Sequence, residues 1–256
     1  MKKRRENRPG TLKDTPFARD LPARSAGLEL DARCSQRLTT AETLKVGRTP
    51  LQLVEVADGG ARMAEETVRK AMEADRPPPA ACKEGCDWCC YLRVGTAVPE
   101  VVRILEYLRQ TLTAEEWQAM RERVAWGAEQ RRQVQSRQRA DPRLPCPLLV
   151  NRRCSAYPVR PLTCRGFNSR DASRCELFVK AKGGVTIPMY HPQQRVMTFT
   201  LDGTRAGLAE SGLKGDVLEL TAALHIALEA PDAVERWLAG DTIFAAARLE
   251  RRDSVT

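Results

Sequence analysis

Eight of the nine cysteines in this 256-residue chain fall into two groups of four, a pattern typical of metal ligation. The first group is packed into nine residues, and the second is spread along a later segment. Four thiolates form the ligand set of structural zinc sites and of iron–sulfur clusters. We therefore expect the metal ligands to be Cys82, Cys86, Cys89, Cys90, Cys146, Cys154, Cys164 and Cys175. The ninth, Cys34, stands alone in a polar region and is expected to play no part.

The spacing of the first group favours local chelation. The two residues between Cys86 and Cys89 let the backbone turn back, so that both sulfurs converge on one ion. Gly85 gives the backbone freedom for that turn. Neighbouring side chains in an extended chain point to opposite faces, so Cys89 and Cys90 are not expected to face the same way. One of the two is expected to face a second metal or a partner loop.

The second group must be assembled by the fold. Its members are separated by seven, nine and ten residues, which is too far for chelation by local chain geometry. Each sulfur is therefore expected to come from a separate loop. Two arrangements stay open: one centre that takes sulfurs from both groups, or two centres side by side.

The metal also stays open between iron–sulfur and zinc. A four-iron cluster is favoured over zinc because eight thiolates exceed what one structural zinc needs, and Cys146-Pro147 resembles the Cys-Pro pairs of ferredoxin-like sites. Arginines near the second group would offset the charge of several thiolates. These arginines are residues 152, 153, 160 and 165.

The compartment bears on the state of the thiols. The first ten residues are charged with no apolar run behind them, and no stretch of some 20 apolar residues follows, so neither a secretory signal nor a membrane span is expected. We expect a cytoplasmic protein with no membrane partner. Because cytosolic thiols are kept reduced, metal ligation is favoured over the alternatives of structural disulfides and free redox thiols.

The formal net charge of +9 is concentrated in two regions. Residues 1–24 carry eight Lys/Arg against three Asp/Glu, and residues 121–153 carry nine Arg against three acids. Such regions can bind nucleic acid or an acidic protein, but charge runs are more often a solvated tail and a solvated helix face. No aromatic residues interleave with the arginines as base-stacking platforms, which weakens the nucleic-acid interpretation.

Several elements must position the cysteines. Capping boxes are expected at Thr39–Glu42, where Gly47 and Pro50 cut the helix short, and at Thr113–Glu116. We expect Trp117, Met120 and Val124 to form the buried stripe of the helix that follows, with its arginines in water. Helices are predicted at about 61–75, 96–111, 113–139, 203–211, 215–229 and 232–250, with a break at Gly240. A β-hairpin is predicted from 185–190 and 195–201, joined by His191-Pro-Gln-Gln.

These elements predict a mainly α fold with a small β-hairpin and an irregular Cys-rich metal-binding core packed between helices. The chain divides into a disordered basic tail, a helical segment with a Pro-rich connector, a cysteine-cluster domain, and a hairpin with C-terminal helices that pack on the same domain. The boundaries expected for these four parts are 1–38, 39–79, 80–180 and 181–256.

The cysteine pattern resembles that of the YkgJ-like cysteine-cluster family, bacterial proteins with a CxxCxxCC signature to which zinc or iron chelation is attributed. The resemblance is carried by the first cysteine group, by Cys146-Pro-Leu-Leu, and by the run from Cys154 to Arg165, and it covers about residues 80–180. One extra residue separates Cys82 from Cys86 relative to the shortest form of the signature. The resemblance implies metal ligation by the eight cysteines. The cysteine pattern is also similar to that of flagellin lysine N-methylases, but no methyl-donor pocket is recognisable in the sequence.

Other residues carry weaker signals. Arg160 and Arg165 are expected to donate hydrogen bonds to cluster sulfurs or to nearby carbonyls, or else to form surface salt bridges. His225 is expected in the core, and His191 in a turn. No Gly-rich phosphate loop or nucleophile elbow is present. Three functions follow: a metal-binding protein, an iron–sulfur redox or lysine methylase-like enzyme, and a metal-scaffolded interaction or nucleic-acid-binding module.

Overall fold

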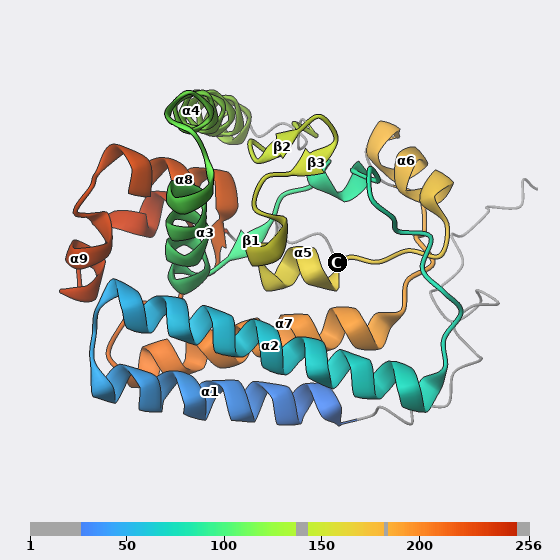
Figure 1. Ribbon diagram of the computed structural model, residues 1–256, viewed down its shortest axis with the longest axis horizontal. Coiled ribbons are helices and arrows are strands. Elements are labelled where there is room, and N and C mark those ends of the chain that lie inside the picture. The colour runs from blue at the N-terminus through green and yellow to red at the C-terminus, as the bar shows by residue number, and fades with distance from the viewer. Residues whose placement is uncertain (1–26, 137–142, 182–183, 250–256) are drawn as a thin grey trace, which may run out of the picture.

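The computed structural model describes residues 27–136, 143–181 and 184–249, with side chains for all of these except 134–136. The described chain is mostly helical, with two small two-stranded antiparallel sheets (Figure 1). The expectation of a mainly α fold with a small β element and a Cys-rich region is thus confirmed. None of the described helices combines the length and apolar character that a membrane crossing needs.

Three long helices form one layer along the long axis of the molecule (Figure 1). They are α1 (Leu28–Val46), α2 (Pro50–Asp75) and α7 (His191–Glu210). Helix α7 approaches α1 so closely that a Cβ at Gly203 would lie 2.4 Å from the Arg33 carbonyl oxygen. At Gly207 it would lie 2.6 Å from the Arg37 carbonyl oxygen. This layer therefore requires glycine at both positions.

A buried amide joins the three helices. The side chain of Gln36 on α1 is 1% exposed. Its Nε2 donates to Thr204 Oγ1 on α7 at 3.1 Å and to the Val56 carbonyl on α2 at 3.2 Å. A buried polar group is tolerated only when it is hydrogen-bonded, so these contacts fix the register of the layer.

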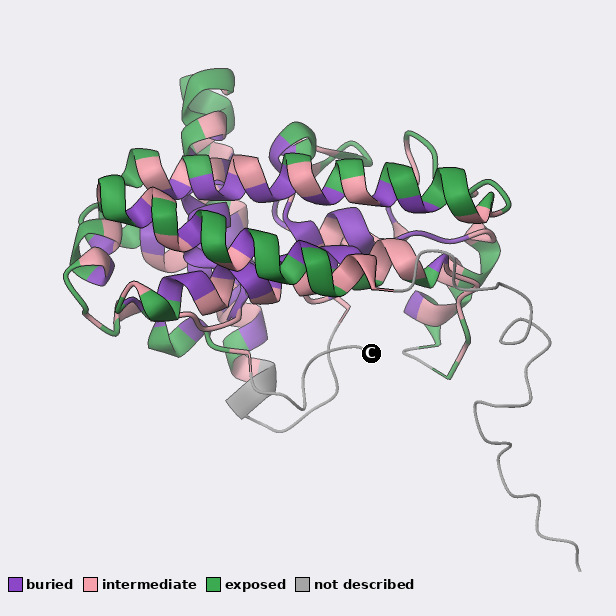
Figure 2. Cartoon of the chain, turned by 90° about the horizontal axis from the view of Figure 1, so that it is seen from below, coloured by how far each residue is buried: buried purple, intermediate pink, exposed green. Residues whose placement is uncertain are grey.

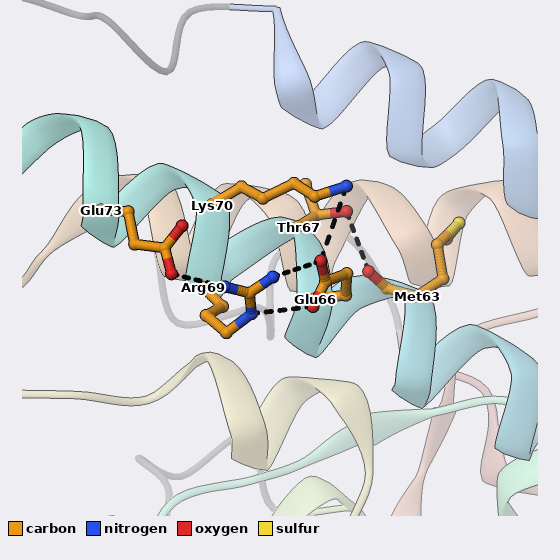
Figure 3. Close-up of polar contacts among 6 residues, drawn as sticks. All are labelled: Met63, Glu66, Thr67, Arg69, Lys70 and Glu73. Carbon is orange, nitrogen blue, oxygen red and sulfur yellow. Dashed lines mark hydrogen bonds and ion pairs between the residues drawn. The ribbon is translucent and has the colours of Figure 1, made fainter.

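Exposed residues line the outer faces of the long helices (Figure 2), and on α2 many of them are charged. Arg69 forms ion pairs with both Glu66 and Glu73, and Lys70 lies 3.6 Å from Glu66 (Figure 3). Exposed pairs of this kind contribute little to stability. The position of α2 is set instead by its buried face, which includes Leu53, Val56, Ala64 and Val68.

The main core lies on the other side of this layer. It is enclosed by α3 (Val98–Thr111), α4 (Ala114–Ser136), α8 (Leu220–Glu229), α9 (Ala233–Leu238) and the 3₁₀ helix η5 (Ile243–Ala247). Strand β1 (Gly95–Thr96) pairs antiparallel with β4 (Leu218–Glu219), with Thr96 opposite Leu218. Both hydrogen bonds of the predicted Thr113–Glu116 capping box are present, at 3.0 and 3.2 Å. Met120 and Val124 are fully buried, which confirms their place in the stripe, and Trp117 is partly buried.

The cysteines lie on short elements between these two parts. These elements are η3 (Trp88–Tyr91), β2 (Leu149–Val150), β3 (Arg153–Cys154), η4 (Tyr157–Val159), α5 (Leu162–Gly166) and α6 (Ala172–Lys180). Strands β2 and β3 form a hairpin with a two-residue turn. The turn residues, Asn151 and Arg152, have φ of 49° and 62°. Left-handed backbone at both turn residues matches the right-handed twist of the flanking strands.

The prediction of a β-hairpin at 185–201 is wrong. Helix α7 begins at His191, with Pro192 in its first turn, where proline fits because the missing N–H would have no helical partner. The β-branched residues that favoured a strand are buried at helical spacing. The buried positions of this stretch are Val196, Met197, Thr200, Leu201 and Thr204.

The N-terminal predictions need two corrections. Residues 28–38, predicted to be disordered, belong to α1, whose helix runs through Thr39–Glu42 and ends before Gly47. Helix α2 starts at Pro50, well before the predicted start near 61, because a proline in the first turn begins a helix without loss of a hydrogen bond. Residues 1–26 of the predicted tail lie outside the described residues.

The C-terminal helices are shorter than predicted. Helix α8 covers only 220–229 of the predicted 215–229, since 218–219 are used in β4. The predicted 232–250 helix is α9 followed by η5, and the break falls at Gly240, whose φ is 99°. The predicted end of α4 near 139 lies outside the described residues. The division of the chain at 79/80 and 180/181 stays a prediction.

Candidate metal centre

The eight cysteines are carried by different short elements. Cys82 and Cys86 precede η3, and Cys89 and Cys90 lie on it. Cys146 precedes β2, Cys154 ends β3, Cys164 lies on α5 and Cys175 on α6. Cys82 is exposed, the other seven are partly buried, and all nine cysteines of the chain carry free thiols.

The first spatial group surrounds a small hollow. Four cysteines line it: Cys82, Cys86, Cys89 and Cys175. The rest of its wall is mainly apolar and comes from Trp88, Leu92, Phe167, Phe178, Val179 and Ile187. Cys175, the last cysteine in the sequence, therefore joins three of the first.

The second spatial group lies against the main core. Cys146 donates its backbone N–H to the Cys90 carbonyl at 2.8 Å. The Cys90 thiol lies within electrostatic reach of Cys146 and Cys164, and Cys164 within reach of Cys154. Cys146, Cys154 and Cys164 all pack against buried residues of the core. Cys90 thus joins the three remaining cysteines of the second sequence group.

The two spatial groups meet at Cys89 and Cys90. The thiols of these neighbours are hydrogen-bonded to each other, and Cys89 is also within electrostatic reach of Cys164. Among the described residues, no three Cys, His, Asp or Glu side chains converge closely enough to hold a metal ion. The structure therefore gathers the thiols into two neighbourhoods without bringing them to coordination distance.

Burial controls the protonation of most of these thiols. It raises the pKa of Cys146 to about 12 and that of Cys164 well above its ordinary value. Burial also raises the pKa of Cys82, Cys154 and Cys175.

The Cys89–Cys90 pair behaves differently. The hydrogen bond from the Cys90 thiol lowers the pKa of Cys89 to about 7, and the same bond raises the pKa of Cys90. Because the thiolate is the form that binds metals, ligation here would release protons, and Cys89 would lose its proton first.

Helix α4 holds the segment that carries Cys146. Arg123 donates from Nε to the Pro147 carbonyl at 2.9 Å, and Arg131 donates from Nη2 to the Leu144 carbonyl at 3.3 Å. Arg131 is only 5% exposed, so the prediction that the arginines of this helix face water is wrong for it. Two of the arginines that suggested a nucleic-acid surface are thus engaged inside the molecule.

A buried carboxylate fixes α5, which carries Cys164. Glu100 is 5% exposed and accepts from the Leu162 N–H at 2.7 Å, Thr96 Oγ1 at 2.8 Å and the Ala97 N–H at 3.1 Å. Burial raises the pKa of this carboxyl group. Sequence reasoning missed Glu100, although a glutamate at the third position of a helix is a recognisable capping signal.

Ser169 and Asn168 position the first group. The Ser169 carbonyl accepts from the Ala81 N–H at 2.7 Å and from the Cys82 thiol at 3.8 Å, and the Ser169 side chain is hydrogen-bonded to Cys175. The buried amide of Asn168 binds the backbone of Tyr190 in both directions, at 2.7 and 3.2 Å. Neither residue carries a sequence signal, because each acts through partners far away in the chain.

The four arginines near the second sequence group have separate contacts. Arg152 pairs with Asp87 at 3.3 Å, and Arg153 with Glu84 at 3.0 Å, so the β2–β3 hairpin is tied to the loop of the first cysteines. Arg165 donates to the Pro158 and Arg160 carbonyls and pairs with Glu65 of α2. Its hydrogen bonds thus go to carbonyls, one of the partners expected for it.

Among these four arginines, Arg160 interacts electrostatically with several of the thiols. Its guanidinium stacks over the Tyr157 ring at 4.1 Å and is within electrostatic reach of Cys82, Cys89 and Cys154. Within the described part of the chain, its buried Nε has no hydrogen-bond partner. A sulfur acceptor close to these cysteines would satisfy that donor, and eight soft thiols suit zinc or iron. The residues present therefore fit a thiolate-bound metal by type and by neighbourhood.

The two histidines stand apart from the thiols. His191 is the exposed first residue of α7 and does not lie in the predicted turn. His225 is only partly buried and lines a separate cavity beside α4, so its predicted place in the core is wrong.

Comparison with known protein families finds a match to part of the chain. Residues 81–182 match the family CxxCxxCC, described as "Putative zinc- or iron-chelating domain". The matched range contains all eight cysteines of the two groups. No curated protein and no solved structure matches the chain.

Proposed function

We propose, from the zinc- or iron-chelating CxxCxxCC domain at residues 81–182, that this protein binds metal through two four-thiolate groups. One group is Cys82, Cys86, Cys89 and Cys175, and the other is Cys90, Cys146, Cys154 and Cys164. The observation that carries the proposal is the exchange of Cys90 and Cys175 between the two sequence groups. Each neighbourhood then holds four thiols, the number that a structural zinc or a four-iron cluster requires.

The metal that we favour is an iron–sulfur cluster of the four-iron type in each group, with zinc as the alternative. Among the described residues the buried Nε of Arg160 has no hydrogen-bond partner, and the sulfur of such a cluster would accept its hydrogen bond and be tuned by it. Eight thiolates also exceed what one structural zinc needs. A cluster would supply one-electron redox chemistry, whereas zinc in a closed thiolate site is structural.

Metal analysis of anaerobically purified protein, with its visible absorption spectrum, tests this function. Iron and sulfide with broad visible absorption would support clusters, zinc in a colourless protein would support structural sites, and a colourless protein free of both metals would contradict the proposal. The two-group arrangement has its own test. Cys90→Ser and Cys175→Ser should each remove about half of the bound metal, whereas one shared centre would lose nearly all of it in either variant. Cys34→Ser is the matched control and should retain the full content.

A second candidate is a redox or protein-modifying enzyme that uses the first group. The apolar hollow beside Cys82, Cys86, Cys89 and Cys175 favours it, since an enzyme needs space next to its reactive centre. Exposed Cys82 would bring that centre near the surface. Anaerobic reduction by dithionite followed by stoichiometric reoxidation would support a redox role. A spectrum that dithionite does not change would argue for the binding function alone.

A further inference from the structure

The two thiol groups differ in how closely a small molecule can approach them. Cys82 of the first group is exposed, and all four cysteines of the second group are partly buried. The hollow beside the first group encloses about 40 Å³, more than the roughly 10–15 Å³ that one water molecule needs. In the second group, Cys146, Cys154 and Cys164 pack against the buried residues of the main core. An external ligand therefore has a way to the first group that the second group does not offer.

The chain that carries the first group is weakly held. Figure 1 shows α6, which carries Cys175, at the opposite end of the molecule from α9. The segment 81–84 is irregular, and its ion pair between Glu84 and Arg153 joins side chains that are 77% and 73% exposed. Exposed pairs contribute little to stability. The Cys82 thiol itself has only a long contact, 3.8 Å, to the Ser169 carbonyl, so this sulfur can move without the loss of a strong interaction.

Buried anchors hold the second group. Glu100 accepts from the backbone of α5, which carries Cys164, and Arg131 donates to the backbone two residues before Cys146. Both anchoring side chains are 5% exposed. The Cys146 N–H also donates to the Cys90 carbonyl. Displacement of a thiol in this group would break buried hydrogen bonds, which are costly to leave unmade.

We infer that the first group is a transfer site that passes its metal to an external thiol ligand, whereas the second group keeps its metal. This inference rests on the proposed function, since it requires metal in both groups. The acceptor is a thiol because a soft ligand competes best with cysteine sulfur for zinc or iron.

The exchange begins at the exposed Cys82. The acceptor thiol loses its proton as its sulfur binds the metal, the bond between the metal and the Cys82 sulfur breaks, and Cys82 takes up a proton from water. The other three sulfurs are replaced in the same way. Each metal–sulfur bond that breaks is replaced by one of the same kind, so no oxidant or reductant is needed.

Zinc release from the full chain tests the inference, because zinc has no redox chemistry that would obscure ligand exchange. Reduced, metal-free protein is loaded with zinc and mixed with an excess of the dithiol dimercaptosuccinate, and the zinc left on the protein is measured over time. We expect about half of the zinc to leave in a fast phase whose rate rises with dithiol concentration, and the rest to leave about tenfold or more slowly.

Serine variants assign the two phases. Cys175→Ser should remove the fast phase, and Cys90→Ser should remove the slow one. Cys34→Ser is the control and should keep both phases.

Tryptophan variants test access without the loss of a thiol. Ile187→Trp places a larger side chain in the wall of the hollow and should slow the fast phase about fivefold or more by narrowing the approach. Val185→Trp makes a similar change two residues away, outside that wall, and should release zinc as the wild type does. Circular dichroism of each variant establishes that it is folded.

The inference and the proposed function fail in different ways. If the loading step gives no stoichiometric zinc binding, the proposed function is wrong and the inference falls with it. If zinc is bound by both groups, three results overturn the inference alone. They are release in a single phase, a fast phase that persists in Cys175→Ser, and a fast phase in Ile187→Trp that is no slower than in Val185→Trp.

Discussion

The α1–α2–α7 layer and the thiol region are built on opposite principles. The layer is held from within: glycines 203 and 207 let α7 touch the backbone of α1, and the Gln36 amide reaches both partner helices. The thiol region is held from outside, by Glu100 on α3, by Arg123 and Arg131 on α4, and by the backbone of Tyr190, just before α7, which binds Asn168. Each of these anchors fixes a backbone segment next to a cysteine.

The two regions differ in how many contacts their own elements make with one another. The three helices of the layer pack directly against one another. In the thiol region the surrounding helices set the position of each short element, but the described thiols stop short of coordination distance. A ligand that binds four thiols would provide the missing internal contacts, since metal binding and folding are coupled in such sites.

Removal of metal is the strongest way to test this contrast. The thiolate bonds to a structural zinc are worth on the order of 10 kcal/mol at neutral pH, so metal-free protein should lose order where the cysteines lie. Hydrogen exchange should rise at 82–91 and 144–177, while the amides of α1 and α7 keep their protection. Re-addition of metal should reverse the change. Equal loss of protection in α7, or no change in either region, would show that the two regions do not differ in this way.

Substitution of the buried glycine tests the helical layer. Gly207→Ala places a Cβ 2.6 Å from the Arg37 carbonyl oxygen and 2.6 Å from Thr40 Cβ, so α7 must move away from α1. We expect the free energy of unfolding in urea to fall by about 2–3 kcal/mol. The matched control is Gly59→Ala on α2, where a Cβ has nothing within 4 Å, and it should gain about 0.5–1 kcal/mol. A loss at Gly59 as large as at Gly207 would mean that close helix approach is not the cause.

Removal of an anchor tests how the thiol region is held. Glu100→Ala leaves the Leu162 and Ala97 N–H groups and the Thr96 hydroxyl without their acceptor. We expect a loss of about 2–3 kcal/mol, because three buried donors lose their partner. Exchange at α5 should rise more than at α1.

The control lies on the same helix. Glu106→Ala removes an exposed carboxylate of α3 that accepts only from Gln110 in the described contacts, and it should change stability by less than about 0.5 kcal/mol. If the two variants differ little, the carboxylate of Glu100 is not an anchor of α5.

Local signals predicted the local features of this fold. The Thr113–Glu116 box marked the start of α4, and the helix end predicted near residue 75 is the end of α2. The hairpin prediction failed at α7 because Val196 and Thr200 favour strands on their own. Their helical spacing becomes decisive only when α1 is present as a surface to pack against.

The grouping of the cysteines was beyond local signals. Sequence spacing placed Cys90 with its neighbours and Cys175 with Cys164. The observed grouping depends on long-range contacts, such as the hydrogen bond from Cys146 to the Cys90 carbonyl and the Ser169 contacts of Cys82 and Cys175. No pattern within a short window carries that information. The prediction that Cys89 and Cys90 face opposite ways assumed an extended chain, but both lie on the 3₁₀ helix η3, and their thiols are hydrogen-bonded to each other.

The smallest effect is expected on the outer face of α2. Arg69→Gln removes the ion pairs with Glu66 and Glu73 that are drawn in Figure 3. All three residues lie on α2, so neither pair joins two helices. Exposed pairs within one helix are screened by water and salt, so the melting temperature should stay within experimental error and should not respond to added salt differently from the wild type. Lys45→Gln, which removes an equally exposed pair with Glu42 on α1, should behave the same way. A clear loss of stability in Arg69→Gln alone would mean that the outer surface of α2, and not only its buried face, holds the layer together.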